Sequence, residues 1–421
     1  MTHDQHTATA TQPARSPGGA MNRWGWLRVG IAVAAVGWGA NQFAPLLLVY
    51  RSQLGLSTAT VNATFGLYAL GLIPGLLVCG PLSDRFGRRR VMLPALIASV
   101  LASVLLIAGG WAVGLLFVGR VVAGVASGAA FSSGAAWIKE LSAAGGPDGR
   151  AAGPRRVTVT MTAGFGGGPL VAGLLAQWAP FPTAVPYLPH LLLVLVAVVL
   201  VLRTPETRVF TPKTHQRGRP ELVELGRQRL RTVVLPLAPW VFGSAAIALA
   251  YLPGLVTDQL GTAALAFTAV VTMLTALAGI LVQPLARRLD VPGSARLVSA
   301  SLAIVVAGLL VSAAAAATGQ PALVVVAILV LGAGYGACQV CGLQEIQRLA
   351  KPESRAGLTA VYQAVSYLGF ALPFLLAAAA PVAPAPVLLL VVAGLAAVTL
   401  GWTARRAASH GSIRQSTTAE R

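Results

Sequence analysis

A short charged stretch between two long apolar segments holds the densest set of ionisable side chains in this sequence. It runs from Gly80 to Arg90 (GPLSDRFGRRR) and carries one carboxylate and four guanidinium groups. Groups of this kind form ion pairs and bind anionic headgroups. The flanking runs, 60–79 and 91–109, contain no charged residue. We therefore expect the stretch to join two membrane-spanning helices at a lipid–water boundary.

Arg120 lies well inside another apolar run, 111–138. An arginine in hydrocarbon is costly, so Arg120 is expected to face the interior of a helix bundle. There it either takes part in coupling or substrate binding, or stabilises the bundle through backbone carbonyls. Other polar and aromatic residues at mid-span either line a cavity or form hydrogen-bonded seams between helices. These residues are Asn41, Gln42, Gln339, Tyr362, Gln363 and Tyr367.

The pattern G-x-L-S-D-R-x-G-R-R-R resembles the loop 2–3 signature of the major facilitator superfamily, a class of twelve-helix transporters. The resemblance implies that Asp84 contacts the start of the eleventh span, near Arg355, when the cytoplasmic side is closed. A carboxylate is favourable there because a helix N-terminus carries partial positive charge and unpaired N–H groups. The alternative is a loop that only anchors the topology. The gating residues that the resemblance implies are Gly80, Asp84, Arg85, Gly87, Arg88 and Arg89.

Two further motifs resemble the same superfamily. Arg120, Gly124 and Gly128 resemble its span 4 signature R-x-x-x-G-x-x-x-G, which is associated with proton coupling or substrate binding. The pattern G-x-x-x-G-P-x-x-A-G resembles the span 5 motif of the drug-proton antiporter branch, with Ala172 where a glycine is usual. That resemblance implies export, although close helix packing alone would select the same small residues. The span 5 hinge residues are Gly164, Gly168, Pro169 and Gly173.

Composition excludes an ordinary soluble domain. The 421 residues are 56% hydrophobic and 10% charged, against roughly a quarter charged in soluble domains. Apolar runs of membrane-spanning length recur, and continuous runs of this kind can satisfy their backbone groups in hydrocarbon only as helices. The predicted spans are 27–49, 60–79, 91–109, 111–138, 157–178, 184–202, 232–255, 262–285, 297–317, 321–345, 356–379 and 384–404. The expected fold is an all-α membrane protein with twelve transmembrane helices.

Two internal matches predict that these helices form two pseudo-symmetric six-helix bundles. A shift of 203 residues places the loop motif on 283–290, which keeps a proline, a leucine and an arginine. A shift of 208 superposes Gly124 and Gly128 on Gly332 and Gly336. Matches at nearly the same offset indicate duplicated halves, the layout of transporters built from repeats.

The positions of the basic residues predict the topology. Of 31 lysines and arginines, Arg51 alone falls in a loop expected outside, and Arg120 lies within a span. The positive-inside rule therefore places both termini in the cytoplasm. We expect a multi-pass protein of a bacterial plasma (inner) membrane. The expected segments are a disordered N-terminal tail (1–22), a first bundle (23–203), a central cytoplasmic loop (204–231), a second bundle (232–404) and a C-terminal tail (405–421).

Several function classes are disfavoured by what the sequence lacks. The net charge is +19, but the arginines fall between apolar spans and not on a folded basic face, which argues against nucleic-acid binding. Cys338 and Cys341 have CxxC spacing without a second pair or a flanking histidine, so we expect no metal and no cofactor. Neither a phosphate-binding loop nor a catalytic constellation occurs, which predicts a secondary transporter and not an enzyme.

The favoured hypothesis is a monomeric, multidrug-like efflux transporter that moves a small organic molecule by alternating access, with protons as the coupling ion. The alternative is an uptake symporter or facilitator for a neutral or anionic metabolite. All twelve acidic residues fall in loops, tails or helix ends, so no proton-carrying residue is assigned and a cationic substrate is disfavoured. A neutral or weakly anionic amphipathic molecule fits Arg120 and the neighbouring amides better.

Overall fold

The computed structural model describes residues 24–207, 224–291, 294–350 and 355–419. The regular elements in these ranges are all helical. The predicted N-terminal tail, 1–22, and the middle of the predicted central loop lie outside them. In the described part of the predicted C-terminal tail, the chain continues the last helix, α17 (Ala385–Ala419).

Twelve helical segments in the described ranges are long and apolar enough to cross a bilayer. The helices of the first half are α1 (Gly25–Asn41), α2 (Phe43–Leu54), α3 (Thr58–Phe86), α4 (Arg88–Ala108), α5 (Val113–Ala143), α6 (Gly146–Trp178), the short turn η1 (Val185–Tyr187) and α7 (Leu188–Leu202). Those of the second half are α8 (Glu224–Arg229), η2 (Leu230–Val234), α9 (Leu235–Ala246), η3 (Ile247–Tyr251), η4 (Leu252–Leu255), α10 (Thr257–Leu260), η5 (Gly261–Ala263), α11 (Ala264–Leu281), α12 (Gln283–Arg288), α13 (Arg296–Thr318), α14 (Pro321–Leu349), α15 (Arg355–Tyr367), η6 (Leu368–Ala371), α16 (Leu372–Ala379) and α17. The predicted fold class is confirmed.

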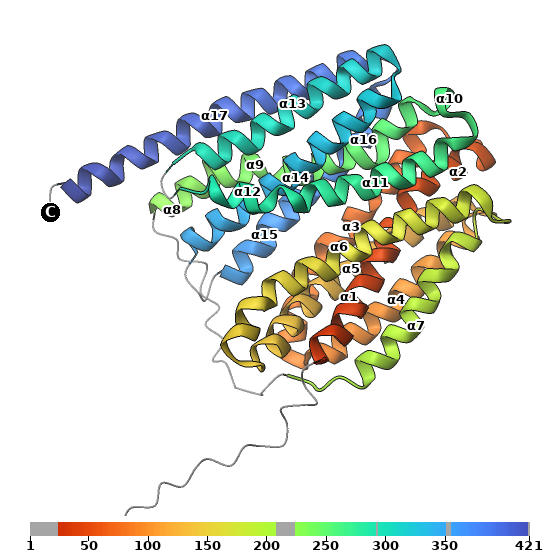
Figure 1. Cartoon of the computed structure of the whole chain (residues 1–421), viewed down its shortest axis with the longest axis horizontal. Coiled ribbons are helices and arrows are strands. Elements are labelled where there is room, and N and C mark those ends of the chain that lie inside the picture. Colours follow the sequence, from red (N-terminus) through yellow and green to blue (C-terminus); the bar gives the residue numbers. More distant parts are fainter. Residues whose placement is uncertain (1–23, 208–223, 292–293, 351–354, 420–421) are drawn as a thin grey trace, which may run out of the picture.

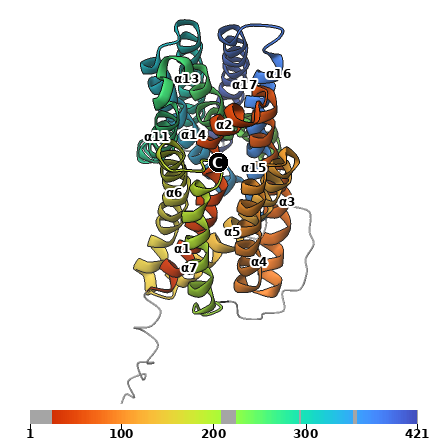
Figure 2. The ribbon, with the colours of Figure 1, turned by 90° about the vertical axis from the view of Figure 1, so that its right-hand side faces the viewer.

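Each half has its own hydrophobic core, so the chain forms two helix bundles side by side (Figures 1 and 2). The first core is drawn mainly from residues between Val29 and Val201, and the second from residues between Val233 and Ala407. Four residues of the second half join the first core and mark where the bundles meet. They are Ala246, Leu249, Tyr367 and Phe370.

Glycines set the tightest helix contacts at corresponding places in the two bundles. A Cβ atom on Gly124 of α5 would lie 2.1 Å from the carbonyl oxygen of Tyr68 in α3. A Cβ atom on Gly332 of α14 would lie 2.6 Å from the carbonyl oxygen of Thr275 in α11. Neither position has room for a side chain. Since a shift of 208 residues relates the two glycines, the repeat in the sequence is a repeat of helix packing.

Two of the membrane-spanning segments are interrupted part-way along their length, each close to a proline. In the first turn of α2, just after α1 ends, Pro45 lacks the N–H group that would bond to the carbonyl of Asn41. At the start of α16, Pro373 cannot bond to the carbonyl of Gly369, which accepts the N–H group of Leu372 in the turn η6 instead. Both breaks adjoin the cavity described below, and residues beside them line it.

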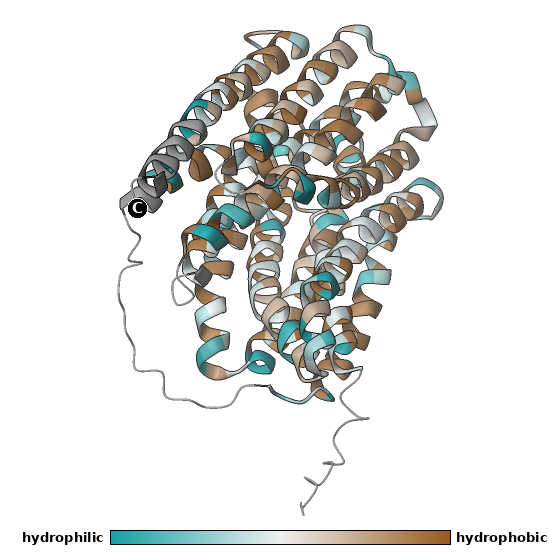
Figure 3. Ribbon diagram, turned by 60° about the vertical axis from the view of Figure 1, so that its left-hand side comes forward, coloured by the Kyte–Doolittle hydropathy of each residue, from teal (hydrophilic) through white to brown (hydrophobic). Residues whose placement is uncertain are grey.

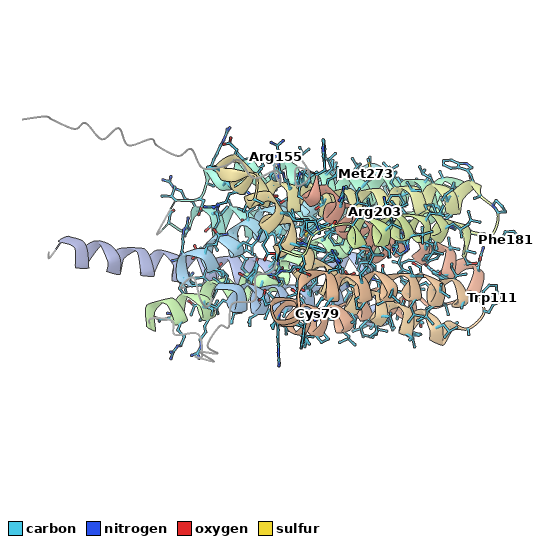
Figure 4. The ribbon with its side chains drawn as sticks, turned by 90° about the horizontal axis from the view of Figure 1, so that it is seen from below. Cys79, Trp111, Arg155, Phe181, Arg203 and Met273 are labelled. Atoms are coloured by element: carbon cyan, nitrogen blue, oxygen red, sulfur yellow. The ribbon has the colours of Figure 1, made fainter. Side chains whose placement is uncertain are left out.

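The two ends of the helices differ in character. The end with the α3–α4 turn and the loop arginines is called the charged end here, and the opposite one the far end. Figure 3 shows apolar residues along the helices, and Figure 4 shows Trp111 and Phe181 projecting at the far end, away from Arg155. Trp111 is 83% exposed and Phe181 is 74% exposed. Large aromatic side chains in this position suit a membrane–water interface.

Candidate functional site

A small cavity lies between the bundles, beside the two helix breaks. Its wall combines residues from α1, α3, α5 and α6 of the first bundle with residues from α9, α15 and η6 of the second. The lining residues are Ala40, Asn41, Phe65, Tyr68, Arg120, Phe165, Phe242, Tyr367 and Phe370. The volume is about 20 Å³, which is room for about one water molecule. A substrate can therefore enter only after the bundles separate.

Arg120 lies in the wall of this cavity with 1% of its surface exposed. Helix α5 directs it toward the first break, where its guanidinium donates to the carbonyl oxygen of Ala40 at 3.0 Å. It also donates to the carbonyl oxygens of Thr64, at 3.3 Å, and Phe65, at 3.4 Å, in α3. Arg120 thus bonds to three backbone carbonyls, as expected of an arginine that stabilises the bundle. It also faces the cavity, as a residue that binds substrate would.

No carboxylate balances the charge of Arg120 within the described residues. Its Cζ atom lies 4.7 Å from the ring centroids of Phe43 and Tyr68 and 5.8 Å from that of Phe65. Carbonyl dipoles and aromatic faces stabilise a cation without cancelling its charge. The positive potential that remains favours a neutral or anionic ligand over a cation.

Aromatic side chains of the second bundle form the opposite wall. Phe242 of α9 and Tyr367 of α15 are stacked with their ring centroids 4.1 Å apart. Phe370 stacks on Phe242 at 5.4 Å and reaches across the interface to Phe65 at 5.3 Å. Such a wall offers a flat apolar surface to an aromatic or amphipathic compound.

The polar residues predicted for the cavity separate into two groups. Asn41 and Tyr367 line the cavity, and Asn41 donates to the carbonyl oxygen of Phe165 at 3.0 Å. Gln42 is buried inside the first bundle instead. Tyr362 donates to a carbonyl oxygen of α14 at 3.1 Å, so it belongs to a seam between α14 and α15.

Gln339 and Gln363 are half-buried and do not line the cavity. Phe165, Phe242 and Phe370 line the cavity but were not predicted. A phenylalanine in the middle of a span can face lipid or a cavity, and the sequence pattern is the same in both cases. In the described part of the chain, no group of three or more His, Cys, Asp or Glu side chains is placed to hold a metal ion.

The glycine motif of α6 packs this helix against both bundles. A Cβ atom on Gly164 would lie 2.3 Å from a backbone oxygen of α1, and one on Gly168 would lie 2.7 Å from another. Gly173 faces the second bundle, where its Cβ atom would lie 2.4 Å from the Cβ atom of Ala269 in α11. Pro169 is buried between them. Close packing accounts for all three glycines, and Gly173 in addition lets the bundles touch.

The charged loop builds an ion cluster at the end of the first bundle. Arg88, whose side chain is 10% exposed, pairs with Asp84 at 2.7 Å and with Glu140 of α5 at 2.7 Å. It also donates to the hydroxyl oxygen of Ser83 at 2.6 Å. Gly87, between α3 and α4, has a φ of +106°, which side chains other than glycine rarely adopt.

The remaining loop residues lie at the surface of this cluster. The side chain of Asp84 is 66% exposed. Its expected contact with the start of the eleventh span falls next to residues 351–354, which lie outside the described ranges, so that contact stays a prediction. Arg85 lies over the ring of Phe86 at 5.1 Å, and a Cβ atom on Gly80 would meet the side chain of Ser132 at 3.6 Å.

Glu206, which follows α7, completes the cluster and was missed in the sequence analysis. Its two carboxylate oxygens accept the backbone N–H groups of Arg88 and Arg89, each at 2.9 Å, and so cap α4. Arg89 donates to the carbonyl oxygen of Thr204, and the hydroxyl of Thr207 donates to Glu140. The segment after α7 is thereby tied to the end of the first bundle. In the sequence, Glu206 is one residue at the start of a loop, with no pattern that indicates a partner.

The second bundle carries an ion cluster centred on an acid. Glu345 of α14, whose side chain is 6% exposed, accepts two hydrogen bonds from Arg229 of α8, at 2.7 and 2.9 Å. Arg348, one turn further along α14, pairs with Asp290 at 2.5 Å and with Glu345 at 3.4 Å. Arginines from two helices thus surround one buried carboxylate.

Comparison with known families places this architecture. Residues 29–374 match the Major Facilitator Superfamily. The chain belongs to this superfamily. The match covers most of the first bundle and the second as far as α16, including the cavity and both ion clusters. Among curated proteins, none matches the chain.

Solved transporter structures share the fold of this superfamily member. A peptide transporter aligns with a TM-score of 0.76 and 15% identity, over 92% of this chain and 95% of its own. A nucleoside transporter aligns with a TM-score of 0.68 and 11% identity, over 89% of this chain and 98% of its own. A D-xylose-proton symporter aligns with a TM-score of 0.66 and 16% identity, over 89% of this chain and 96% of its own. The family and these neighbours point to a transporter rather than an enzyme.

Proposed function

We propose that this protein moves a neutral or weakly anionic, amphipathic small molecule across a bacterial plasma membrane by alternating access to the cavity. The observation that carries the proposal is Arg120, a buried cation that faces an aromatic wall and contacts no carboxylate among the described residues. A cationic substrate would meet a like charge in a medium of low dielectric constant. An aromatic or weakly anionic substrate gains contacts with both walls.

Alternating access requires contacts that can break on one side of the cavity. Toward the far end, Gly173 meets Ala269, and the side-chain oxygen of Gln177 accepts the N–H group of Ala266 at 3.2 Å. Both contacts cross between the bundles. The two ion clusters at the charged end each lie within one bundle.

In this proposal the segments 23–203 and 232–404 move against each other about the connection 204–231, with the charged end and both termini in the cytoplasm. A single chain supplies both walls of the cavity, which supports a monomer as the working unit. The gating role of Asp84 and the other loop residues belongs to the same proposal.

The direction we propose is export in exchange for protons, supported by the resemblance of the α6 motif to the antiporter branch. A second candidate is uptake by symport or facilitated diffusion. It is favoured by a different observation, the lack of an acidic side chain among the described residues that line the cavity. A D-xylose-proton symporter also shares the fold.

Flux into proteoliposomes, with and without an imposed pH gradient, tests the proposal on size-matched neutral, anionic and cationic aromatic compounds. We expect transport of neutral or anionic compounds and none of cations. Arg120→Gln should abolish anion transport, Arg120→Lys should keep the charge preference, and Arg51→Gln, which changes an exposed arginine, should leave flux unchanged. Cation transport, or unchanged anion flux in Arg120→Gln, would contradict the charge argument. Substrate that accumulates against the direction of proton flow indicates antiport, and substrate that accumulates in the direction of proton flow indicates symport. Flux that does not respond to the pH gradient indicates facilitated diffusion.

A further inference from the structure

A histidine buried inside the first bundle has no part in the transport argument so far. His190 of α7 is 0% exposed and lies between two serines of α4. The hydroxyl oxygen of Ser99 is 3.1 Å from its Nε2 atom, and that of Ser103 is 2.8 Å from its Nδ1 atom. A Cβ atom on Gly39 of α1 would lie 2.4 Å from Nε2, so α1 closes the cage around the ring.

A chain of hydrogen bonds leads from this ring to the break between α1 and α2, beside the substrate cavity. The Nε2 group of Gln42 donates to the hydroxyl oxygen of Ser103 at 3.2 Å. Gln42 stands at the break between α1 and α2, next to Asn41 in the cavity wall. Arg120 donates to the carbonyl of Ala40 at the same break. The chain therefore ends where the proposed substrate contacts begin.

The donors and acceptors of this chain fit a neutral imidazole. Because Ser103 accepts from Gln42, its own hydroxyl hydrogen can donate to Nδ1 of His190. The ring is then neutral, with its hydrogen on Nε2 and directed at Ser99. The Oε1 atom of Gln42 is left buried without a hydrogen-bond partner among the described residues.

That unpaired oxygen shows how the same cage takes up a proton. A proton on Nδ1 makes this nitrogen a donor to Ser103, whose hydroxyl hydrogen then needs another acceptor. If the amide of Gln42 turns over, its Oε1 atom becomes that acceptor. The imidazolium donates one charge-assisted hydrogen bond to each serine, and the oxygen of Gln42 is paired in place of its amide nitrogen. The neutral and the protonated ring thus use the same side chains, but donor and acceptor exchange roles in the hydrogen bonds from His190 to Ser103 and from Ser103 to Gln42.

We propose that His190 binds the coupling proton of this transporter and that Ser103 and Gln42 relay its protonation state to the break between α1 and α2. This inference rests on the proposed function. The proton adds to Nδ1 and leaves from it, so no other reactant is needed. With Arg120 already at the break, a second positive charge in the first bundle would raise the affinity of the cavity for an anion. The anion and the proton would then bind together, as symport, the second candidate function, requires.

The electrostatic surroundings of the ring contain no acid to hold the proton permanently. The elements packed against α7 are α1, α4 and η1, and neither these three nor α7 itself contains Asp or Glu. Their titratable groups are Arg28 in α1, Arg88 to Arg90 at the charged end of α4, and Tyr187 in η1, which is hydrogen-bonded to Tyr50 at 2.9 Å. Release of the proton is therefore not opposed by a buried carboxylate.

The first test measures proton binding in the absence of substrate. Nitrogen-15 NMR of histidine-labelled full-length protein in nanodiscs, with His3, His6, His215 and His410 changed to Gln, follows the His190 ring over the pH range in which histidines titrate. We expect reversible protonation, with a midpoint that moves in Ser103→Ala but not in Ser133→Ala, a buried serine of α5 outside the chain. A ring that stays neutral until the protein unfolds, or a midpoint unmoved by Ser103→Ala, would overturn the proposal.

The second test measures coupling in proteoliposomes that contain a pH-sensitive dye, with a compound that the wild type transports. His190→Gln should lose substrate-linked proton movement and retain downhill substrate exchange, and Ser133→Ala should retain both. Proton movement of wild-type size in His190→Gln would overturn the assignment. Should the wild type carry no compound at all, the proposed function fails, whereas the NMR titration still decides whether His190 takes up a proton.

Discussion

The ion clusters at the charged ends of the two bundles are built around opposite charges. In the first, the buried centre is the cation Arg88, and its acids Asp84 and Glu140 are 66% and 36% exposed. In the second, the buried centre is the anion Glu345, and its partner Arg229 is 11% exposed. The first cluster thus opens toward water on its acidic side, whereas the main pair of the second is enclosed.

The duplicated helices keep their packing while the charges change. The 208-residue shift that superposes the packing glycines places Glu140 on Arg348, so this position has inverted its sign. The connection between the bundles supplies the matching groups, with Glu206 at its beginning and Arg229 at its end. Each cluster therefore ties one end of the connection to one bundle. Since a charge with an exposed partner is easily rehydrated, the two clusters should differ in how much stability they contribute.

The largest loss of stability is expected from Glu345→Ala. It leaves Arg229 nearly buried without its two hydrogen-bond acceptors, and breaking a buried pair from one side costs about 3–5 kcal/mol. Chemical denaturation in detergent measures the loss, with Asp148→Ala, an exposed acid at the start of α6, as the control. A loss no greater than that of the control would remove the distinction between the clusters.

A smaller loss is expected from Arg88→Ala. The acids that remain are partly exposed and can be hydrated, so the cost is that of charged hydrogen bonds, about 1.5–3 kcal/mol. The same denaturation experiment gives the comparison, and the double variant Arg88→Ala/Glu140→Ala should lose less than the sum of the two single ones. A greater loss than that of Glu345→Ala would reverse the ranking of the clusters.

Glu206→Gln tests the contact between the segment after α7 and the start of α4. The free energy of unfolding should fall by about 1 kcal/mol, the usual contribution of a helix cap. The neutral amide offers one acceptor in place of two to the N–H groups of Arg88 and Arg89. Hydrogen exchange at those two amides should accelerate, while exchange in the second bundle should not change. Thr207→Val, which removes only the contact with Glu140, is the matched control. Unchanged protection at Arg88 would show that the cap contributes little.

The sequence predicts the spans, the loop motif and the burial of Arg120, because hydrophobic length and isolated charges depend on local composition. It could not assign faces within a span. Asn41 and Gln42 are neighbours that were given one role, yet successive helical residues point about 100° apart, so one lines the cavity and the other turns toward His190. Glu206 and Arg229 lie in the connection, and each finds its partners only when the bundle beside it has formed. No local pattern could identify those pairs.

The smallest change in stability is expected from Asp84→Asn, and it separates folding from function. The Asp84 side chain is 66% exposed, so its pair with Arg88 contributes about 0–1 kcal/mol. Turnover should nevertheless fall, because an amide lacks the negative charge that is proposed to meet the start of the eleventh span when the charged end closes. Flux and denaturation are measured on the same preparations, with Asp148→Asn as the control for charge. Wild-type turnover in Asp84→Asn would reduce the loop to a topological anchor, and both clusters would then be purely structural.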